Sequence, residues 1–267
     1  MFQHIALNEK FDFVYWTGDL PPHNIWNQTR NDQLNAYSHL TSLFLKYFPG
    51  KSIYPTLGNH EAAPYNLFPT PNIKQDNISW LYTALADNWS QTGLPSYLRT
   101  NITSGAFYTY LIAPGVRLVS LNMNYCPKIN FWLLINSTDP LGQLEWLANV
   151  LQYSESNGEK VHIIGHINPA SCLEAWSENY YRIINRYEST VTGQFFGHTH
   201  YDEFELFYDL NNNSRAVNVA YIAGSVTTYP NLNPGYRIYT VDGIYSNTSW
   251  YVLDHESYIM NLTEANN

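Results

Sequence analysis

The sequence predicts an α/β fold in which helices cover a layered sheet. Strand-like apolar runs alternate with amphipathic helical segments over the first part of the chain, and four short polar clusters each follow such a run. The last part alternates apolar and polar residues, which predicts mainly antiparallel strands. A chain of 267 residues is long enough for one domain with a sizeable core.

The first segment predicts a β-α-β crossover. Residues 11–16 form an apolar run, and residues 28–48 repeat apolar side chains every three or four positions, as a helix does. Pro49 and Gly50 end this helix, and residues 52–57 predict the next strand. Crossovers of this type build layered α/β sheets.

The middle of the chain leaves the sheet and returns to it. Residues 62–95 are rich in Pro, Asn and Trp and predict a long excursion with a short helix near 79–88. Residues 106–112 and 117–122 predict a hairpin around Pro114-Gly115. The remaining elements are predicted in chain order as a helix at 142–154, a strand at 161–164, a helix near 177–187, and strands at 194–196, 203–208, 217–221, 236–241 and 249–253.

Composition excludes some partners. The net charge is −9, and the 13 Lys and Arg residues form no run, so the chain lacks the basic surface that nucleic acids require. The acidity gives no attraction to anionic lipid, although a zwitterionic headgroup does not need it. No apolar stretch has the length that spans a bilayer, so we expect no transmembrane segment.

Cysteines and sequons bear on the compartment. Cys126 and Cys172 form either a disulfide or two separate thiols. The many Asn-x-Ser/Thr glycosylation triplets favour passage through the oxidising secretory pathway. The start of the chain lacks the basic and apolar regions of a signal peptide, and we expect a secreted or lysosomal protein shortened at its N-terminus. The triplets begin at Asn27, Asn77, Asn88, Asn101, Asn136, Asn212, Asn247 and Asn261.

The four polar clusters offer metal ligands. They are GDLPPH at 18–23, GNHE at 58–61, GHINP at 165–169 and GHTH at 197–200. Each cluster alone is a common sequence. Four of them, each in a loop after a strand, indicate a shared site, because loops at the carboxyl ends of strands meet at one edge of an α/β sheet. The mixture of oxygen and imidazole donors suits more than one divalent ion. The candidate donors are Asp19, Asn59, His166, His198 and His200.

The order GD, GNHE, GH and GHTH resembles that of the calcineurin-like metallophosphoesterases, and the likeness extends further. The segments YWTGDLPPHNIWNQTR, SLNMNYC, FWLLINSTDP and LNPGYR are similar to those of the acid sphingomyelinase family, across nearly the whole chain. This resemblance implies a four-layer α/β/β/α sandwich with a di-zinc site. It also implies that the first strand of the sandwich, with its ligand loop, is missing here.

The resemblance implies roles for individual residues. Asp19 would bridge two zinc ions, with Asn59, His166 and His198 completing one site and His200 belonging to the other. His60 would protonate the leaving alkoxide, and His23 would hold a phosphate oxygen. For this chemistry we expect a histidine near its unperturbed pKa of about 6.5. Asn66 and Tyr229 would line the substrate pocket, and Cys126 would pair with Cys172.

The chain departs from the family in its metal ligands. The family draws an Asp-x-His pair from upstream of GD, and His4 lies in an unrelated context. We therefore expect one complete zinc site and low activity. Residues 1–267 are expected to be a single catalytic domain, incomplete at both ends and without the family's saposin-like domain.

The leading hypothesis for function is a zinc phosphodiesterase that cleaves sphingomyelin at a membrane surface into ceramide and phosphocholine. A second is a phosphodiesterase for nucleotides or other soluble phosphate esters. A third, of another class, is a non-catalytic secreted glycoprotein that binds lipid or a protein partner. The sequence does not indicate the oligomeric state.

Overall fold

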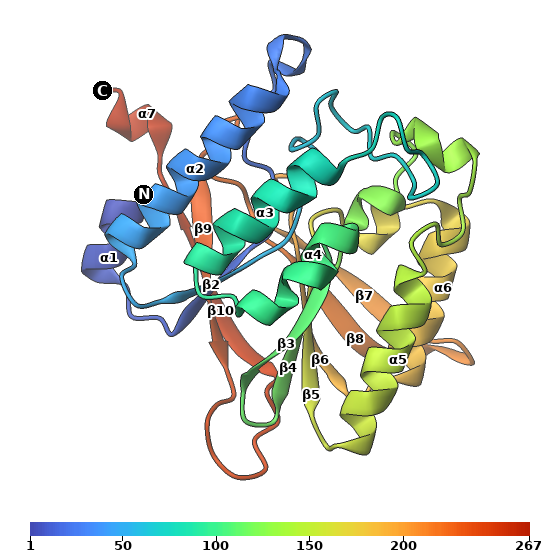
Figure 1. Ribbon diagram of the computed structural model, residues 1–267. Coiled ribbons are helices and arrows are strands. Elements are labelled where there is room, and N and C mark those ends of the chain that lie inside the picture. The colour runs from blue at the N-terminus through green and yellow to red at the C-terminus, as the bar shows by residue number, and fades with distance from the viewer.

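A computed structural model describes all 267 residues and has a six-stranded sheet at its centre (Figure 1). The strand order is β3-β4-β5-β6-β8-β7, with β4, β5, β6 and β8 parallel and the two edge strands antiparallel to their neighbours. The strands are β3 (Tyr108–Ala113), β4 (Val116–Ser120), β5 (Lys160–Ile164), β6 (Val191–Phe196), β7 (Glu203–Asp209) and β8 (Asn212–Ile222).

Two further strand pairs form a second sheet layer. β1 (Phe13–Trp16) runs parallel to β2 (Ser52–Pro55), and β9 (Gly235–Val241) runs antiparallel to β10 (Val252–Ile259). The ring of Phe195 on β6 lies 5.2 Å from that of Tyr15 and 4.9 Å from that of Tyr239. Since Phe195 touches both pairs, they pack on the same face of the six-stranded sheet.

Helices cover both outer faces. On the far face of the six-stranded sheet, Leu147, Leu151, Trp176 and Tyr180 form a buried cluster with the strands. The four helices that precede β3 pack outside the second sheet layer (Figure 1). This is the predicted four-layer sandwich. The helices are α1 (Phe2–Asn8), α2 (Arg30–Tyr47), α3 (Ser79–Gln91), α4 (Arg99–Gly105), α5 (Gln143–Ser156), α6 (Glu174–Arg186) and α7 (Leu262–Ala265).

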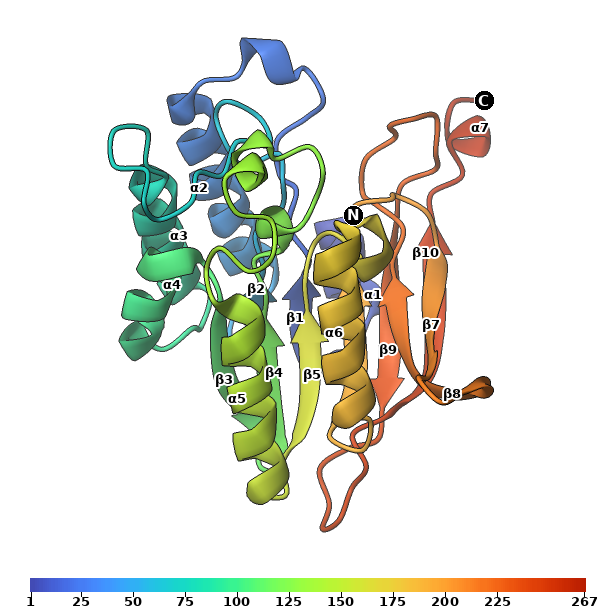
Figure 2. The ribbon, with the colours of Figure 1, turned by 90° about the vertical axis from the view of Figure 1, so that its right-hand side faces the viewer.

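Short 3-10 turns connect these elements, namely η1 (Ile25–Asn27), η2 (Ser96–Leu98), η3 (Met123–Tyr125), η4 (Phe131–Leu134) and η5 (Pro169–Ser171). The carboxyl ends of β1, β2, β5 and β6 point to the same end of the molecule, at the top of Figure 2. The four polar clusters follow these strands directly. Parallel topology thus gathers them in one place.

The predicted helices and strands are present, with boundaries that differ by a few residues. The helix predicted at 28–48 is α2, which begins with a capping box because Thr29 and Asp32 each accept a hydrogen bond from the other's backbone N–H. The prediction of a strand at 249–253 was wrong at its start: β10 begins at Val252. Trp250 has a φ of 57°, which no strand accommodates. Helices α1 and α4 were not predicted.

The disulfide that the resemblance implied is present between Cys126 and Cys172. It fixes η3 beside η5, so the segment after β4 is tied to the GHINP loop. None of the helices combines the length and apolar character needed to cross a membrane.

A buried histidine joins the layers. His162 on β5 donates its Nε2–H to the carbonyl oxygen of Trp250 at 2.8 Å, and its Nδ1 accepts from the hydroxyl of Tyr15 at 2.9 Å. It therefore links the six-stranded sheet to β1 and to the segment that precedes β10. Burial lowers the pKa of His162 from 6.5 to about 4, because a charged imidazolium would have no solvation there.

This shift predicts a pH-dependent stability. Between pH 6.5 and 4 the unfolded chain carries a proton on His162 and the folded chain does not, so acidification lowers the free energy of unfolding through that window. A pKa difference of this size corresponds to about 3 kcal/mol. His162→Gln should flatten the dependence, measured by denaturant unfolding at several pH values. His39→Gln, at an exposed position on α2, is the control, and an unchanged slope in His162→Gln would contradict the assignment.

Candidate metal centre

Two loops in contact form the base of the site. A Cβ atom added to Gly18 would lie 2.5 Å from the backbone nitrogen of Gly58, and one added to Gly58 would overlap Asp19. Only glycine permits this approach. Asp19 itself has a φ of 62°, which turns its carboxylate toward the ends of the parallel strands.

Four of the predicted ligands converge here. Nε2 of His166 lies 3.0 Å from Oδ2 of Asp19 and 2.9 Å from Oδ1 of Asn59. Nδ1 of His198 lies 3.0 Å from the same Asn59 oxygen and 3.3 Å from Nε2 of His166. Four side chains from four loops therefore present four donor atoms to one point.

Neighbouring groups orient these side chains. His166 donates its Nδ1–H to the carbonyl oxygen of Thr17 at 2.7 Å, which leaves Nε2 facing the centre. The amide nitrogen of Asn59 donates to Asn66 Oδ1 at 2.8 Å and to the hydroxyl of Tyr65 at 3.2 Å, so its carbonyl oxygen also faces inward.

The donor set fits a divalent cation. Nδ1 of His166 faces the Thr17 carbonyl and its Nε2 faces two oxygen acceptors, an arrangement that either a second ring proton or a cation bound at Nε2 satisfies. The ligand atoms of Asp19, His166 and His198 all lie within 4.8 Å of one another. Imidazole, carboxylate and amide donors together suit ions such as zinc.

The electrostatics favour the metal-binding forms of Asp19 and His198, whereas the pKa of His166 is raised because the charge and hydrogen bond of Asp19 outweigh burial. Burial alone would raise the pKa of Asp19, but the charge and hydrogen bond of His166 outweigh it and hold this pKa below its ordinary value. Burial, followed by the neighbouring His166, lowers the pKa of His198 to about 4. Asp19 is therefore ionised and His198 neutral near neutral pH, as metal ligands must be.

The other predicted residues lie beside this centre. The ring of His23 stacks on Tyr229 with centroids 3.7 Å apart, and its centroid lies 4.4 Å from that of His60 and 5.3 Å from that of His200. His200 donates its Nδ1–H to the carbonyl oxygen of Tyr229 at 2.7 Å, while its side chain stays outside the group of converging donors. His200 therefore lies close to His23 and not among the ligand atoms of Asp19, Asn59, His166 and His198.

The titration of two of these histidines differs from the expectation. Burial lowers the pKa of His60, whose Nε2 lies 3.9 Å from Asp19 Oδ2, and burial with the nearby His200 lowers the pKa of His23. The expectation of a proton donor with an ordinary pKa was wrong for His60, and the pKa of His23 is lowered as well, because each imidazole loses solvation in the centre. The Nδ1 atom of His60 is buried without a hydrogen-bond partner.

Backbone strain is concentrated in the site. Asp19, Asn66, His198 and His200 all adopt positive φ, between 62° and 74°. A non-glycine residue in this region costs on the order of 1 kcal/mol, which the surrounding contacts must offset. Such clustering is typical of functional sites.

Comparison with known proteins agrees with this geometry. Residues 1–202 match the family model described as calcineurin-like phosphoesterase. The chain belongs to the calcineurin-like phosphoesterase family. It is 58% identical to a sphingomyelin phosphodiesterase of Bos taurus and 56% identical to one of Homo sapiens, each over 96% of this chain and 41% of the relative. The chain thus spans about two fifths of these relatives' length.

The same fold occurs in a solved structure of low sequence similarity. A dimetal phosphatase from Danio rerio superposes with a TM-score of 0.59 at 16% identity, covering 89% of this chain and 83% of that one. Membership of this phosphoesterase family implies that the centre binds divalent metal. The fold class and family that the sequence predicted are therefore confirmed.

A buried acid beside the centre escaped the sequence analysis. Glu61, the last residue of GNHE, is fully buried and accepts hydrogen bonds at Oε1 from the backbone N–H of Asp19 at 2.8 Å and from the hydroxyl of Tyr37 at 3.2 Å. Burial, followed by the charge of Asp19, raises its pKa to about 8. The position of Glu61 inside the GNHE motif was the sequence feature that could have identified it.

The NMNYC motif also supports the site from behind. The amide nitrogen of Asn124 donates to the carbonyl oxygen of Gly58 at 3.1 Å, and Asn124 is buried. This bond holds the GNHE loop against the Gly18–Asp19 turn. The motif therefore positions a ligand loop without contributing a ligand atom.

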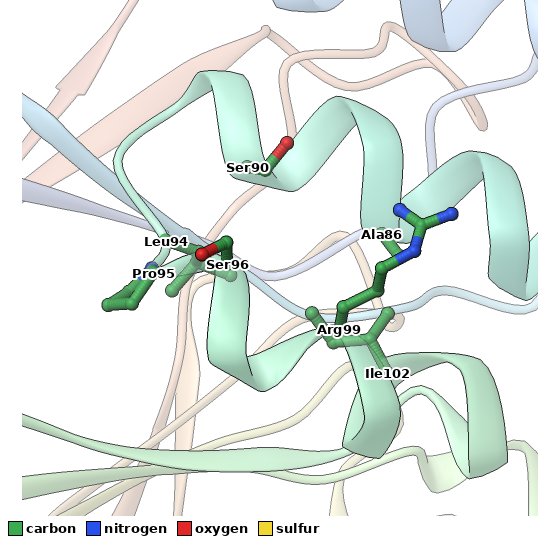
Figure 3. A pocket seen from close by; sticks show the side chains of 7 residues that line it. All are labelled: Ala86, Ser90, Leu94, Pro95, Ser96, Arg99 and Ile102. Atoms are coloured by element: carbon green, nitrogen blue, oxygen red, sulfur yellow. The ribbon is translucent and has the colours of Figure 1, made fainter.

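A separate hollow of about 80 Å³ lies between α3 and the start of α4 (Figure 3). No residue of the metal centre lines it, and Arg99 at its edge pairs with Asp87. It therefore takes no part in the chemistry of the centre. Its lining consists of Ala86, Ser90, Leu94, Pro95, Ser96, Arg99 and Ile102.

The contacts of Glu61 predict a positioning role. Glu61→Leu removes the acceptor that fixes the backbone of Asp19 and should weaken divalent-metal affinity by about 10- to 100-fold, measured by competition with a fluorescent chelator. Glu61→Gln retains an oxygen at this position and should restore most of the affinity. Equal losses in both variants, with unchanged thermal stability in each, would contradict this role.

Proposed function

We propose that this chain is a zinc-dependent phosphodiesterase that hydrolyses sphingomyelin to ceramide and phosphocholine. The observation that carries the proposal is the convergence of Asp19, Asn59, His166 and His198 on one point, with His60 and His23 beside it. The identity to sphingomyelin phosphodiesterases supports the choice of substrate.

The four converging side chains would hold one zinc, and His200 with Asp19 would contribute to a second. Bound zinc would supply Lewis acidity toward the phosphoryl group and an activated water. Asp19 provides an ionised carboxylate at the shared position because His166 keeps its pKa low. Thr17, Asn66 and Tyr65 hold the ligands in place, so binding requires little reorganisation.

The neighbouring histidines would act on the phosphodiester. His60 would donate a proton to the leaving alkoxide of ceramide, because its ring lies beside the centre, 4.4 Å from that of His23. Its lowered pKa would rise when an anionic phosphate binds beside it, because a nearby negative charge favours the imidazolium. His23, held by its stacking on Tyr229, would bind a phosphate oxygen, and Asn66 would shape the pocket wall.

The proposed compartment is extracellular or lysosomal, with glycans on the surface. Seven of the eight sequon asparagines are exposed. Asn88 differs, because its side chain accepts a hydrogen bond from the Thr41 hydroxyl at 3.1 Å and donates to the Ala84 carbonyl at 2.8 Å. We propose glycans at the exposed positions and none at Asn88.

The role of His60 can be tested with leaving groups. His60→Gln should lower kcat for sphingomyelin by about 10²- to 10⁴-fold, because an alkoxide needs a proton to depart. With bis(p-nitrophenyl) phosphate, whose leaving group is stable as an anion, the loss should be much smaller. His23→Gln should affect both substrates alike. Equal losses for His60→Gln on both substrates would exclude general-acid catalysis by His60.

The function itself is tested by substrate preference and metal removal. Phosphocholine release from sphingomyelin in detergent micelles should exceed phosphate release from ATP, and chelation should abolish both until zinc is restored. Faster hydrolysis of ATP would instead assign the chain to soluble nucleotide esters. Absence of any zinc-restored hydrolysis would overturn the enzyme assignment.

A further inference from the structure

Exposed apolar side chains surround the end of the molecule that carries the metal centre. They come from η1 and from the segment around η4, and we name them the apolar rim. Trp26 is 93% exposed, Leu134 89% and Phe131 69%, which are unusual values for side chains of this size. The rim consists of Trp26, Ile129, Phe131, Leu134 and Ile135.

Both rim segments are joined to the site. η1 begins two residues after His23. On the η4 side, the amide nitrogen of Asn130 donates to the carbonyl oxygen of Phe68 at 3.0 Å, and the hydroxyl of Tyr125 donates to that of Pro69 at 2.9 Å. These bonds hold the η4 segment on the chain that follows Asn66. η1 (blue) and η4 (green) both lie at the end toward which the parallel strands point (Figure 2).

The rim is presented rigidly. The disulfide at Cys126 anchors the chain just before Ile129, and the side chains of Leu133 and Asn130 are buried beneath the exposed ones. The apolar groups therefore project from a fixed base. A rigid projection loses little conformational entropy when it enters another phase.

The charge pattern identifies the partner. Residues 24–29 and 129–138 contain no Asp, Glu, Lys or Arg, although the whole chain has a net charge of −9. The first charged residues beyond them are Asp19 and Arg30 around the first segment and Lys128 and Asp139 around the second, so each segment is flanked by one acidic and one basic residue. Uncharged aromatic and aliphatic tips whose flanking charges cancel suit an interface of acyl chains and headgroups without net charge, which is that of a zwitterionic bilayer.

We propose that the apolar rim inserts into the headgroup region of a zwitterionic phospholipid bilayer and thereby brings the metal centre to a membrane lipid. This inference rests on the proposed function, because a phosphodiester at the bilayer surface is reached only when the protein surface around the centre meets the bilayer. Trp26 and Phe131 enter the interface, where aromatic rings are favoured. No covalent step is involved.

The test compares vesicle binding of the full chain and two double variants. Large vesicles of pure phosphatidylcholine, without sphingomyelin, are used so that binding is independent of turnover. Trp26→Ser/Leu134→Ser should reduce the partition constant of the protein from water to vesicles at least about tenfold, because two large apolar side chains no longer leave water on binding. The matched control is Ile244→Ser/Leu253→Ser, at residues 79% and 64% exposed in the β9–β10 connection and at the start of β10, and it should bind as the unsubstituted chain does.

Hydrolysis of bis(p-nitrophenyl) phosphate provides the second readout, and it should be unchanged in both double variants because the rim contacts no ligand of the centre. Absence of vesicle binding by the unsubstituted chain, or equal loss in both double variants, would overturn the inference. Self-association that the rim variant abolishes, with vesicle binding unaffected, would also overturn it by assigning the rim to a protein partner. Failure of soluble-ester hydrolysis alone would count against the proposed function, while the vesicle comparison would still decide the role of the rim.

Discussion

The site depends on the contact between the Gly18–Asp19 turn and the Gly58–Asn59 turn. Because neither glycine has a side chain, the two backbones approach until Asp19 Oδ1 accepts the N–H of His60 at 3.0 Å. This contact fixes the spacing between an ionised carboxylate and a neutral amide oxygen. His166 and His198 then approach from the six-stranded sheet, so the centre joins the two sheet layers.

Burial has opposite consequences for the charged groups around this contact. Asp19 stays ionised because His166 compensates for lost solvation, whereas the pKa of Glu61 rises to about 8 because burial and the charge of Asp19 outweigh the opposing effect of His166. His60 and His198 lose solvation without full compensation, which favours neutral imidazoles, whereas Asp19 raises the pKa of His166. Such a centre is electrostatically incomplete without a cation, and this agrees with its membership of a metal-dependent phosphoesterase family.

The support for the centre extends well beyond its ligands. Asn124 holds the GNHE loop, Tyr65 and Asn66 orient Asn59, and the disulfide fixes the segment from which the apolar rim projects. One network therefore connects ligand geometry with the surrounding surface. His162, in the middle of β5, performs a comparable function, because its two hydrogen bonds join the six-stranded sheet to β1 and to the segment that precedes β10.

The sequence by itself determined the α/β class, most elements and the residue types of the centre, because amphipathic periodicity and glycine-containing loops are local properties. It did not predict α1, α4 or the start of β10, since Trp250 takes its conformation while its carbonyl binds His162 on a distant strand. It included Glu61 in the GNHE motif without assigning this residue a role, and it gave the proton-donating histidine an ordinary pKa. Only the tertiary structure decided these points, because desolvation and hydrogen bonding depend on which distant residues exclude water from a side chain.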